Sequence, residues 1–272
     1  MFLFYDIGGT NTRIGISHDG SSLDEQYTFE TETDYKKGFE KLINQTKVHI
    51  DIKKVKTIIA GLPGNLSEDK SFLQRSPHLP NWENQNFNLD LKKYFECPIY
   101  LENDTALVGL GEAIFGAGKG SEIVGYITIS TGVGGVRIEN GKIDANRYGF
   151  EIGHQHIKDN LTLEELVSGT VISQKYNMHP RDILDEKVWN EYTDDLALGI
   201  SNMILFWSPD IIVVGGSMSR SVLFERLEKK VEDSTDILKK IPRIVKSELD
   251  TVGGLYGGLA YIQNINKENK NI

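Results

Sequence analysis

The stretch FLFYDIGGTNTRIGIS, residues 2–17, opens the chain with two short apolar runs on either side of a glycine-rich turn. Residues 2–5 and 12–17 have the aromatic and β-branched content of strands, and Gly8 and Gly9 interrupt them. Residues 22–30 predict a third strand after a short polar turn. The chain is therefore expected to begin as a β-meander whose first turn is rich in Gly, Thr and Asn.

The same pattern returns in the second half of the sequence. Residues 123–130 predict a strand, residues 131–135 a glycine turn and residues 136–139 another strand. Backbone amides in such a turn can point at phosphate oxygens, and glycine permits the close approach and the positive φ angles. An ordinary hairpin turn is the alternative for either turn alone. The repetition suggests two related halves that face each other across a cleft.

The remaining chain alternates between helical and strand patterns. Helices are predicted at residues 34–50, 89–95, 104–115, 163–176, 188–206, 222–231 and 254–262, and strands at residues 55–60, 98–101 and 211–214. Residues 264–272 are rich in Asn and Lys and predict a frayed tail.

Composition excludes several classes of protein. A net charge of -9 argues against a nucleic-acid binder, which usually needs a basic face. The single cysteine, Cys97, excludes an intrachain disulfide and a multi-cysteine metal site, and suits a reducing compartment. No apolar run approaches 20 residues, so no membrane span is expected. There is no P-loop, and Arg137 stands where a dinucleotide motif would need its third glycine.

Two aspartates lie at positions where catalytic chemistry is plausible. Asp104 follows the predicted strand 98–101 and opens the helix 104–115, and Asp6 ends the first strand. Transfer of a phosphoryl group to an alcohol needs a base close to the attacking hydroxyl. An Asp at a helix N-terminus is, however, often only a cap, and Asp6 could equally satisfy turn amides. The residue types by themselves leave both interpretations open.

Four motifs together resemble the ROK family of repressors, open reading frames and kinases. They are DIGGTN at residues 6–11, END at 102–104, STGVGG at 130–135 and EIGH at 151–154, in the family's order and approximate spacing. The resemblance extends from about residue 2 to residue 261. It implies an α/β, two-lobed, ribonuclease-H-like or actin-like ATPase fold with a cleft between the lobes. The N-terminal lobe would span residues 1–115, completed by the C-terminal helix 254–272, and the C-terminal lobe residues 116–253.

The resemblance implies ATP-dependent phosphorylation of a hexose at the 6-hydroxyl, as in a glucokinase. Asp104 would be the general base, Asn103 would bind a neighbouring hydroxyl, and Asp6 would lie near Mg²⁺ and the transferred phosphate. A kinase of an N-acetylated amino sugar or of fructose is the alternative, and a non-catalytic sugar-sensing protein a more remote one. A DNA-binding regulator of this family would need a helix-turn-helix before the first glycine turn, which here begins at residue 6.

The resemblance also assigns two sets of binding residues. ATP would be bound by Asp6, Gly8, Gly9, Thr10, Asn11, Thr12, Thr131, Gly132, Gly134, Gly215, Gly216 and Gly254. The sugar would be bound by Gly64, Asn81, Asn103, Asp104, Glu151, His154 and Glu164.

The chain departs from the family between His154 and Glu164. Most members carry a cysteine zinc loop there, whereas residues 155–163 contain no cysteine. No zinc is therefore predicted, and the means by which His154 and Glu164 are held in place becomes an open question. The expected ligands are a sugar, ATP and Mg²⁺, with no nucleic acid and no membrane, in a cytoplasmic protein that is compatible with a homodimer.

Overall fold

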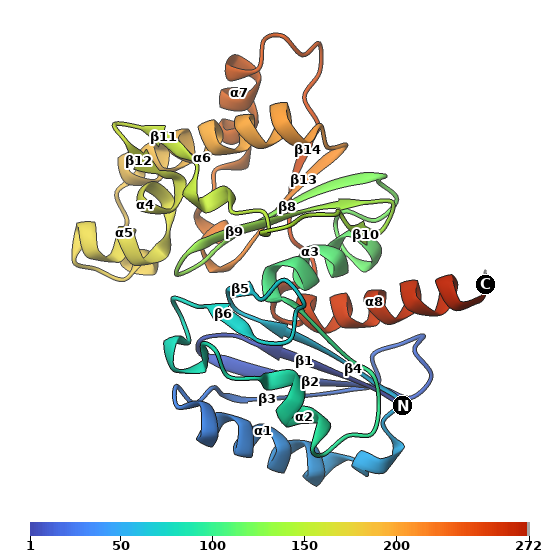
Figure 1. Cartoon of the computed structure of the whole chain (residues 1–272). Helices are drawn as coiled ribbons and strands as arrows, with labels where there is room; N and C mark the ends of the chain where they lie inside the picture. Colours follow the sequence, from blue (N-terminus) through green and yellow to red (C-terminus); the bar gives the residue numbers. More distant parts are fainter. Residues whose placement is uncertain (271–272) are drawn as a thin grey trace. The chain divides into compact units, whose positions relative to one another are not determined.

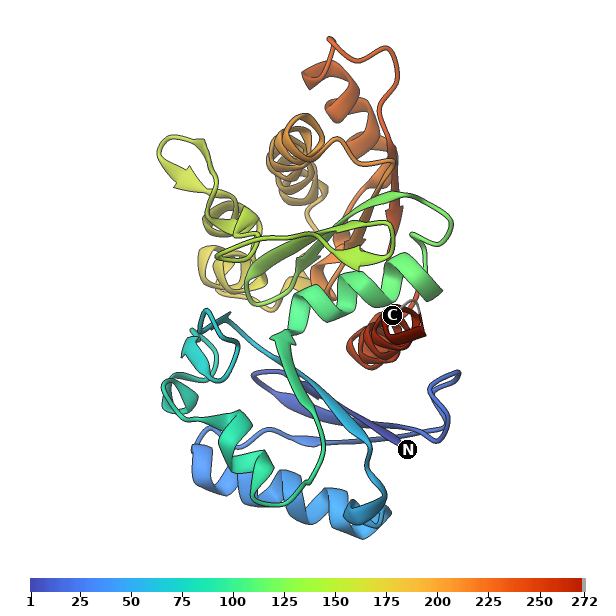
Figure 2. The same ribbon diagram turned by 45° about the vertical axis from the view of Figure 1, so that its right-hand side comes forward.

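The computed structural model describes residues 1–270, with side chains to residue 268, and divides into two compact units (Figures 1 and 2). Unit 1 comprises Met1–Gly111, Arg147–Gly149 and the described chain from Thr251 onward. Unit 2 comprises Glu112–Asn146 and Phe150–Asp250. The helix α3 (Asp104–Phe115) therefore begins in unit 1 and ends in unit 2.

Unit 1 is built on a five-stranded mixed sheet with the strand order β3-β2-β1-β4-β7. β1 pairs antiparallel with β2 and parallel with β4, which pairs parallel with β7. Its elements besides α3 are β1 (Phe2–Ile7), β2 (Asn11–Ser17), β3 (Glu25–Glu30), α1 (Tyr35–His49), β4 (Thr57–Leu62), β5 (Asn65–Leu66), β6 (Leu73–Arg75), α2 (Phe87–Lys92), β7 (Ile99–Asn103) and α8 (Gly253–Lys270).

The alternation of side chains along β1 places helices on both faces of this sheet. Leu3 and Tyr5 join a core cluster with residues of α1, and the Tyr5 hydroxyl lies 2.9 Å from the Thr46 hydroxyl of that helix. Phe4 points the opposite way, against Gly258 of α8. Figure 1 accordingly shows α1 and α8 on opposite sides of the sheet.

Unit 2 repeats the topology with the strand order β10-β9-β8-β13-β14. β8 takes the place of β1, because it pairs antiparallel with β9 and parallel with β13. The elements are β8 (Ile123–Ile129), β9 (Val133–Glu139), β10 (Lys142–Ile143), β11 (His156–Lys158), β12 (Leu161–Thr162), α4 (Leu163–Val167), α5 (Gly169–Tyr176), α6 (Glu186–Trp207), β13 (Ile211–Gly215), α7 (Phe224–Ser234) and β14 (Arg243–Lys246). α6 and α7 lie on one side of the sheet and close the core of unit 2 (Figure 1).

Two expectations about local structure are wrong, and two short hairpins have no counterpart among the predictions. The single helix predicted at residues 163–176 is broken at Ser168, which is extended and whose hydroxyl accepts the Val171 N–H to cap α5. The tail predicted to fray from residue 264 is helical as far as Lys270, and residues 271–272 lie outside the described chain. The hairpins β5–β6 and β11–β12 were not expected, because strands of two or three residues leave almost no periodicity to recognise.

The helices α3 and α8 approach each other within unit 1 at their backbones. A Cβ atom on Gly257 would overlap the carbonyl oxygen of Leu107, and one on Gly111 would overlap the carbonyl oxygen of Gly253. Both obstacles are backbone atoms, so they cannot turn aside as a side chain can. Glycine at these two positions therefore sets the separation of the two helices.

We expect Gly257→Ala to lower the free energy of unfolding by about 1–3 kcal/mol, as overpacking of a well-packed interface does. The gain in helix propensity from alanine, about 1 kcal/mol, is smaller than the cost of moving two helices apart. Urea denaturation monitored by circular dichroism measures the effect. Lys267→Ala, on an exposed position of the same helix, is the control and should change stability by less than about 0.5 kcal/mol. Equal stability of the two variants would contradict the packing argument.

Candidate active site

The first predicted carboxylate lies in the interior of unit 1. Asp6, near the end of β1, is only 7% exposed, and its Oδ2 accepts a hydrogen bond from Arg13 Nη1 at 3.3 Å. A Cβ atom on Gly254, at the start of α8, would come within 2.6 Å of the Asp6 carboxyl carbon. Burial raises the pKa of Asp6, and the Arg13 charge opposes that rise. Arg13 was not among the predicted site residues, although a hairpin about residues 9 and 10 pairs positions 6 and 13.

The second carboxylate begins α3 but does not cap it. Asn103, the last residue of β7, accepts the Ala106 N–H at its Oδ1 at 3.0 Å and so performs the capping role. Its Nδ2 donates to the carbonyl oxygen of Gly64 at 3.0 Å. Asp104 Oδ1 accepts the N–H of Thr105 at 2.7 Å. The helix cap is therefore Asn103 and not Asp104.

The two carboxylates act on each other electrostatically. Burial and the nearby Asp6 charge together raise the pKa of Asp104 to about 7. A carboxylate with a pKa near neutrality can take up a proton at physiological pH, which one with an ordinary pKa does poorly. The pair Asp6 and Asp104 thus has the electrostatic character of a general base beside a second anionic group.

Some of the hydrogen-bonding groups of the first glycine turn are bonded to other groups within the protein. The Gly8 N–H donates to the Asn11 carbonyl at 2.9 Å, and the Thr12 and Thr31 hydroxyls lie 2.8 Å apart. Thr10 is exposed at the tip of the turn. A Cβ atom on Gly9 would come within 2.9 Å of the His78 Cβ, so the turn packs against the segment 76–82.

The segments of unit 1 that are predicted to bind the sugar are held by several contacts. Gly64 has φ +126°, and a Cβ there would overlap the Arg75 carbonyl oxygen, so only glycine fits. Asn81 is exposed in a 3-10 turn (Pro80–Trp82), whereas Trp82 is buried and donates its indole N–H to Glu32. Lys70, also absent from the prediction, donates to the buried carboxylate of Glu102 at 2.5 Å. This ion pair ties the β5–β6 loop to the strand that ends at Asn103.

In unit 2 the second glycine turn lies at the carboxyl ends of β8 and β13, where parallel strands commonly bind ligands. Thr131 is exposed, and Gly132 and Gly134 are partly exposed. Gly215 and Gly216 lie beside the turn, since a Cβ on Gly216 would overlap the Ile129 carbonyl oxygen. Ser217 N–H, in the next 3-10 turn (Ser217–Ser221), donates to Ser130 Oγ at 3.1 Å, which joins the two loops.

Three predicted sugar-binding residues also come together in unit 2. Glu151 precedes a 3-10 turn (Ile152–His154) that ends at His154, and Glu151 Oε2 and His154 Nε2 lie 4.0 Å apart. Glu164 Oε2 accepts the Val133 N–H at 2.8 Å, so α4 is attached to the second glycine turn. Burial and the Glu164 charge raise the pKa of Glu151, and His154 opposes the rise. Glu165, the next residue along α4, forms a capping box with Thr162.

The β11–β12 hairpin occupies the position of the missing zinc loop, between His154 and Glu164. Leu163 N–H donates to the Gln155 carbonyl at 2.9 Å, which closes the hairpin at its base between His154 and Glu164. The Gln155 side-chain oxygen Oε1 accepts a hydrogen bond from Asn202 Nδ2 of α6 at 2.8 Å. Asp159 and Asn160 form the tip with φ angles of 50° and 60°, a conformation that Asn and Asp tolerate. Hydrogen bonds to a neighbouring helix therefore hold this segment.

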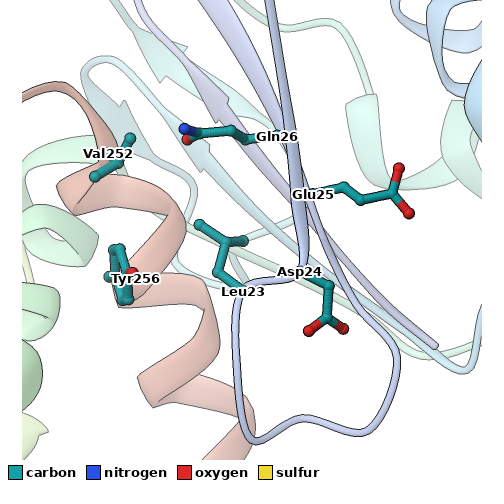
Figure 3. Close-up of a pocket in the computed structure, with 6 residues that line it drawn as sticks. All are labelled: Leu23, Asp24, Glu25, Gln26, Val252 and Tyr256. Atoms are coloured by element: carbon teal, nitrogen blue, oxygen red, sulfur yellow. The ribbon is translucent and has the colours of Figure 1, made fainter.

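A separate pocket in unit 1 contains none of the predicted site residues. Figure 3 shows its lining, from the end of the β2–β3 connection, the start of β3 and the residues on either side of the start of α8: Leu23, Asp24, Glu25, Gln26, Val252 and Tyr256. Asp24 is already engaged with His18 and Ser22, whose hydrogen bonds lower its pKa to about 2.

The described residues 1–270 contain no cluster of three or more His, Cys, Asp or Glu side chains that could hold a metal ion. None of their helices is both long and apolar enough to cross a membrane.

The fold matches that of a ROK family glucokinase from Streptomyces griseus solved in complex with glucose and AMPPNP. The TM-score is 0.76, with 19% identity over 96% of this chain and 98% of that chain. Such a likeness establishes the fold, and the chain has the α/β architecture of the actin-like ATPases, as predicted.

The sequence places the chain more narrowly. A model of the ROK family matches residues 4–265, so the chain belongs to the ROK family, which confirms the resemblance drawn from its motifs. It is 26% identical to a glucokinase of Thermotoga maritima, over 84% of this chain and 86% of that protein. It is 27% identical to an N-acetylgalactosamine kinase of a Shewanella species, over 92% and 88%. Its enzyme class is that of the carbohydrate kinases.

The raised pKa of Asp104 has a consequence for stability. In the unfolded chain this carboxyl ionises near pH 4, whereas in the folded protein it holds its proton to about pH 7. The folded state therefore binds more protons in this range, and stability falls as the pH rises from about 4 to 7. We expect Asp104→Asn to lose this dependence and to be more stable than the wild type at pH 8 by about 1–3 kcal/mol.

Denaturation in urea at pH 5 and pH 8 measures the difference. Asp69→Asn is the control, because hydrogen bonds from Ser67 and Ser71 lower the pKa of Asp69, so this carboxyl is ionised throughout the range from pH 5 to pH 8. The difference in stability between that variant and the wild type should therefore be the same at both pH values. A wild type and an Asp104→Asn variant with parallel pH profiles would show that Asp104 titrates normally.

Proposed function

We propose that this protein transfers the γ-phosphoryl group of ATP to the 6-hydroxyl of a hexose, with Asp104 as the general base. The observation that carries the proposal is the position of Asp104: a carboxylate with a pKa of about 7, at the first residue of a helix that its neighbour caps. In the transfer, the hydroxyl oxygen forms the new bond to phosphorus while its proton passes to Asp104. The bond from phosphorus to the bridging oxygen breaks, and ADP leaves.

Asp6 is proposed to act on the nucleotide side of the reaction. Its carboxylate is buried beside Asp104 and against the first turn of α8, and such hard oxygen donors suit Mg²⁺, which keeps most of its ligands as water and phosphate oxygens. When bound, Mg²⁺ offsets the charge of the phosphates. Arg13 holds the Asp6 side chain in its orientation by the hydrogen bond at 3.3 Å.

The two glycine turns are proposed to hold the phosphates, and Gly215, Gly216 and Gly254 to approach the nucleotide closely. Exposed donors remain at the turn tips, where Thr10 and Thr131 lie. The Streptomyces griseus glucokinase was solved with the ATP analogue AMPPNP, which supports ATP as the donor in this chain.

The sugar is proposed to contact two groups of side chains. Unit 1 would supply Gly64, Asn81 and Asn103, and unit 2 would supply Glu151, His154 and Glu164. A hexose hydroxyl needs both a donor and an acceptor, and carboxylates, amides and imidazole provide them. Glucose is the first candidate because of the glucokinase relatives. An N-acetylated amino sugar is the second, because the Shewanella relative is named for one, and fructose remains a third alternative.

Compartment and assembly are further proposals. The lone thiol of Cys97, with a pKa raised by burial, suits a reducing cytoplasm. A homodimer is proposed on the family resemblance, and light scattering of the purified protein would measure the mass directly.

We expect Asp104→Ala to reduce kcat by about 10²–10⁴-fold, the contribution of a positioned general base. The measurement is ADP release from MgATP with glucose, fructose, mannose and N-acetylated amino sugars, and NMR of the product identifies the phosphorylated hydroxyl. In the wild type kcat/KM should rise with pH and level off above about 7, because only the ionised carboxylate accepts the proton. Asp51→Asn, an exposed cap of a 3-10 turn in unit 1, should retain full activity. Activity of Asp104→Ala within tenfold of the wild type would exclude Asp104 as the base.

The sugar itself is best identified by its effect on stability. A ligand at 100 times its Kd stabilises the folded protein by about 2.7 kcal/mol, which a thermal shift detects. We expect one class of hexose to raise Tm, and Glu151→Gln to raise the KM for that sugar by about tenfold with little change in kcat, since the carboxylate binds a hydroxyl away from the reaction. Glu165→Gln, next to Glu164 but engaged in the helix cap, is the matched control. A KM unchanged by Glu151→Gln would remove Glu151 from the site.

A further inference from the structure

A buried carboxylate outside the proposed substrate contacts joins two distant parts of the chain. Glu112, in α3, is 0% exposed. Its Oε1 accepts hydrogen bonds from Ser247 Oγ at 2.7 Å and from Leu249 N at 2.8 Å, and its Oε2 accepts from Ala117 N at 3.0 Å. Glu248 N donates to both oxygens, at 3.1 and 3.2 Å. Each of these partners is a donor, so the site suits a group that only accepts.

The partners of Glu112 lie where the chain passes between the two units. The chain leaves unit 1 between Gly111 and Glu112 and, apart from the short stretch Arg147–Gly149, returns to it between Asp250 and Thr251. The segment 247–249 thus immediately precedes the return, and Glu112 immediately follows the departure. On the unit 1 side, Gly111 lies against the backbone of Gly253. The Glu112 carboxylate therefore fastens the segment that leads into α8 to the C-terminal part of α3.

Both of those helices lead to the proposed catalytic carboxylates. α3 begins at Asp104, eight residues or about 12 Å before Glu112 at the rise of an α-helix. α8 begins at Gly253, and Gly254 lies against the Asp6 carboxyl group. A change in the spacing of the two helices would therefore disturb the contact of Gly254 with the Asp6 carboxyl group and shift Asp104 relative to that contact.

We propose that Glu112 is a positioning residue for phosphoryl transfer: its carboxylate holds the chain entering α8 against α3, and thereby sets the geometry of Asp6 and Asp104. The inference rests on the proposed function, in which these two carboxylates act on the phosphate and on the sugar hydroxyl. Glu112 itself contacts neither in this scheme. Its effect is transmitted by two rigid helices that touch at their backbones.

The substitution Glu112→Gln tests this role with little change of shape. It replaces one acceptor oxygen by an amide NH₂, which then faces backbone N–H groups and repels them. The segment 247–249 loses part of its attachment, and the start of α8 can move away from α3. A displacement of about 1 Å at a catalytic group can cost about 100-fold in rate, so we expect kcat to fall by about 10- to 100-fold.

The pH profile separates positioning from simple stability. Moving Asp6 away from Asp104, or admitting water, lowers the pKa of Asp104 from about 7 toward its ordinary value. In Glu112→Gln we expect the apparent pKa of the acid limb of the kcat/KM profile to be lower than in the wild type by about half a pH unit or more. The control is Asp210→Asn, which also weakens a carboxylate that accepts two backbone N–H groups, those of Glu122 and Ile123. It is remote in sequence from both crossings and should leave the acid limb in place.

A second measurement needs no enzymatic activity. Carbon-13 NMR of the Asp104 carboxyl in the full-length protein reports its pKa directly, with Asp104→Asn used to assign the signal. The Asp104 pKa should be lower in Glu112→Gln than in the wild type, and unchanged in Asp210→Asn. If the wild type phosphorylates no sugar, the proposed function fails, and the NMR titration still decides whether Glu112 sets the environment of Asp104.

The outcomes are distinct. A folded Glu112→Gln with a lower Tm but the wild-type kcat, acid limb and Asp104 pKa overturns the inference and leaves Glu112 a purely structural residue. If Glu112→Gln does not fold, Ser247→Ala takes its place, because it removes one donor and leaves the carboxylate and the amides. That variant should shift the Asp104 pKa in the same direction by a smaller amount, and an unchanged pKa would overturn the inference.

Discussion

The burial of Asp6 close to Asp104 is the constraint around which unit 1 is organised. Burial raises the pKa of both carboxyl groups, and the Asp6 charge raises the pKa of Asp104 further. Two buried carboxyl groups stay close together, at a cost in folding free energy, only where the surrounding structure is rigid enough to prevent them from separating. The Arg13 hydrogen bond, the paired strands β1 and β4, and the helices α3 and α8 supply that rigidity.

Glycine makes this arrangement sterically possible. The backbones of α3 and α8 can touch only because Gly111 and Gly257 have no side chains between them. The Asp6 carboxyl group likewise reaches the first turn of α8 only because residue 254 lacks a side chain. Packing at this distance leaves no side chains to adjust, so a small displacement anywhere along the contact is passed on to its end. The Glu112 carboxylate lies next to this contact and is fastened by hydrogen bonds alone.

In unit 2, hydrogen bonds between loops hold the predicted sugar-binding side chains in place. Glu151, His154 and Glu164 belong to a region that lacks the family's cysteine loop, yet each lies on a segment attached to the sheet or to α6. Glu164 binds the second glycine turn, so the predicted sugar residues and a predicted phosphate loop share one support. A hairpin of eight residues, 155–162, is sufficient because its base is closed by one backbone hydrogen bond.

The sequence by itself determined the α/β fold class, the repeated strand–turn–strand pattern and the family, because strand periodicity, glycine positions and four spaced motifs are local properties. It also named Asp104, but it could not separate a base from a helix cap. Only the tertiary structure decided that Asn103 is the cap, that Arg13 and Lys70 brace the neighbouring carboxylates, and that Glu112 joins residues about 135 positions away. Those facts depend on how individual side chains are oriented and on which segments the fold brings together, and the periodicity of the sequence records neither.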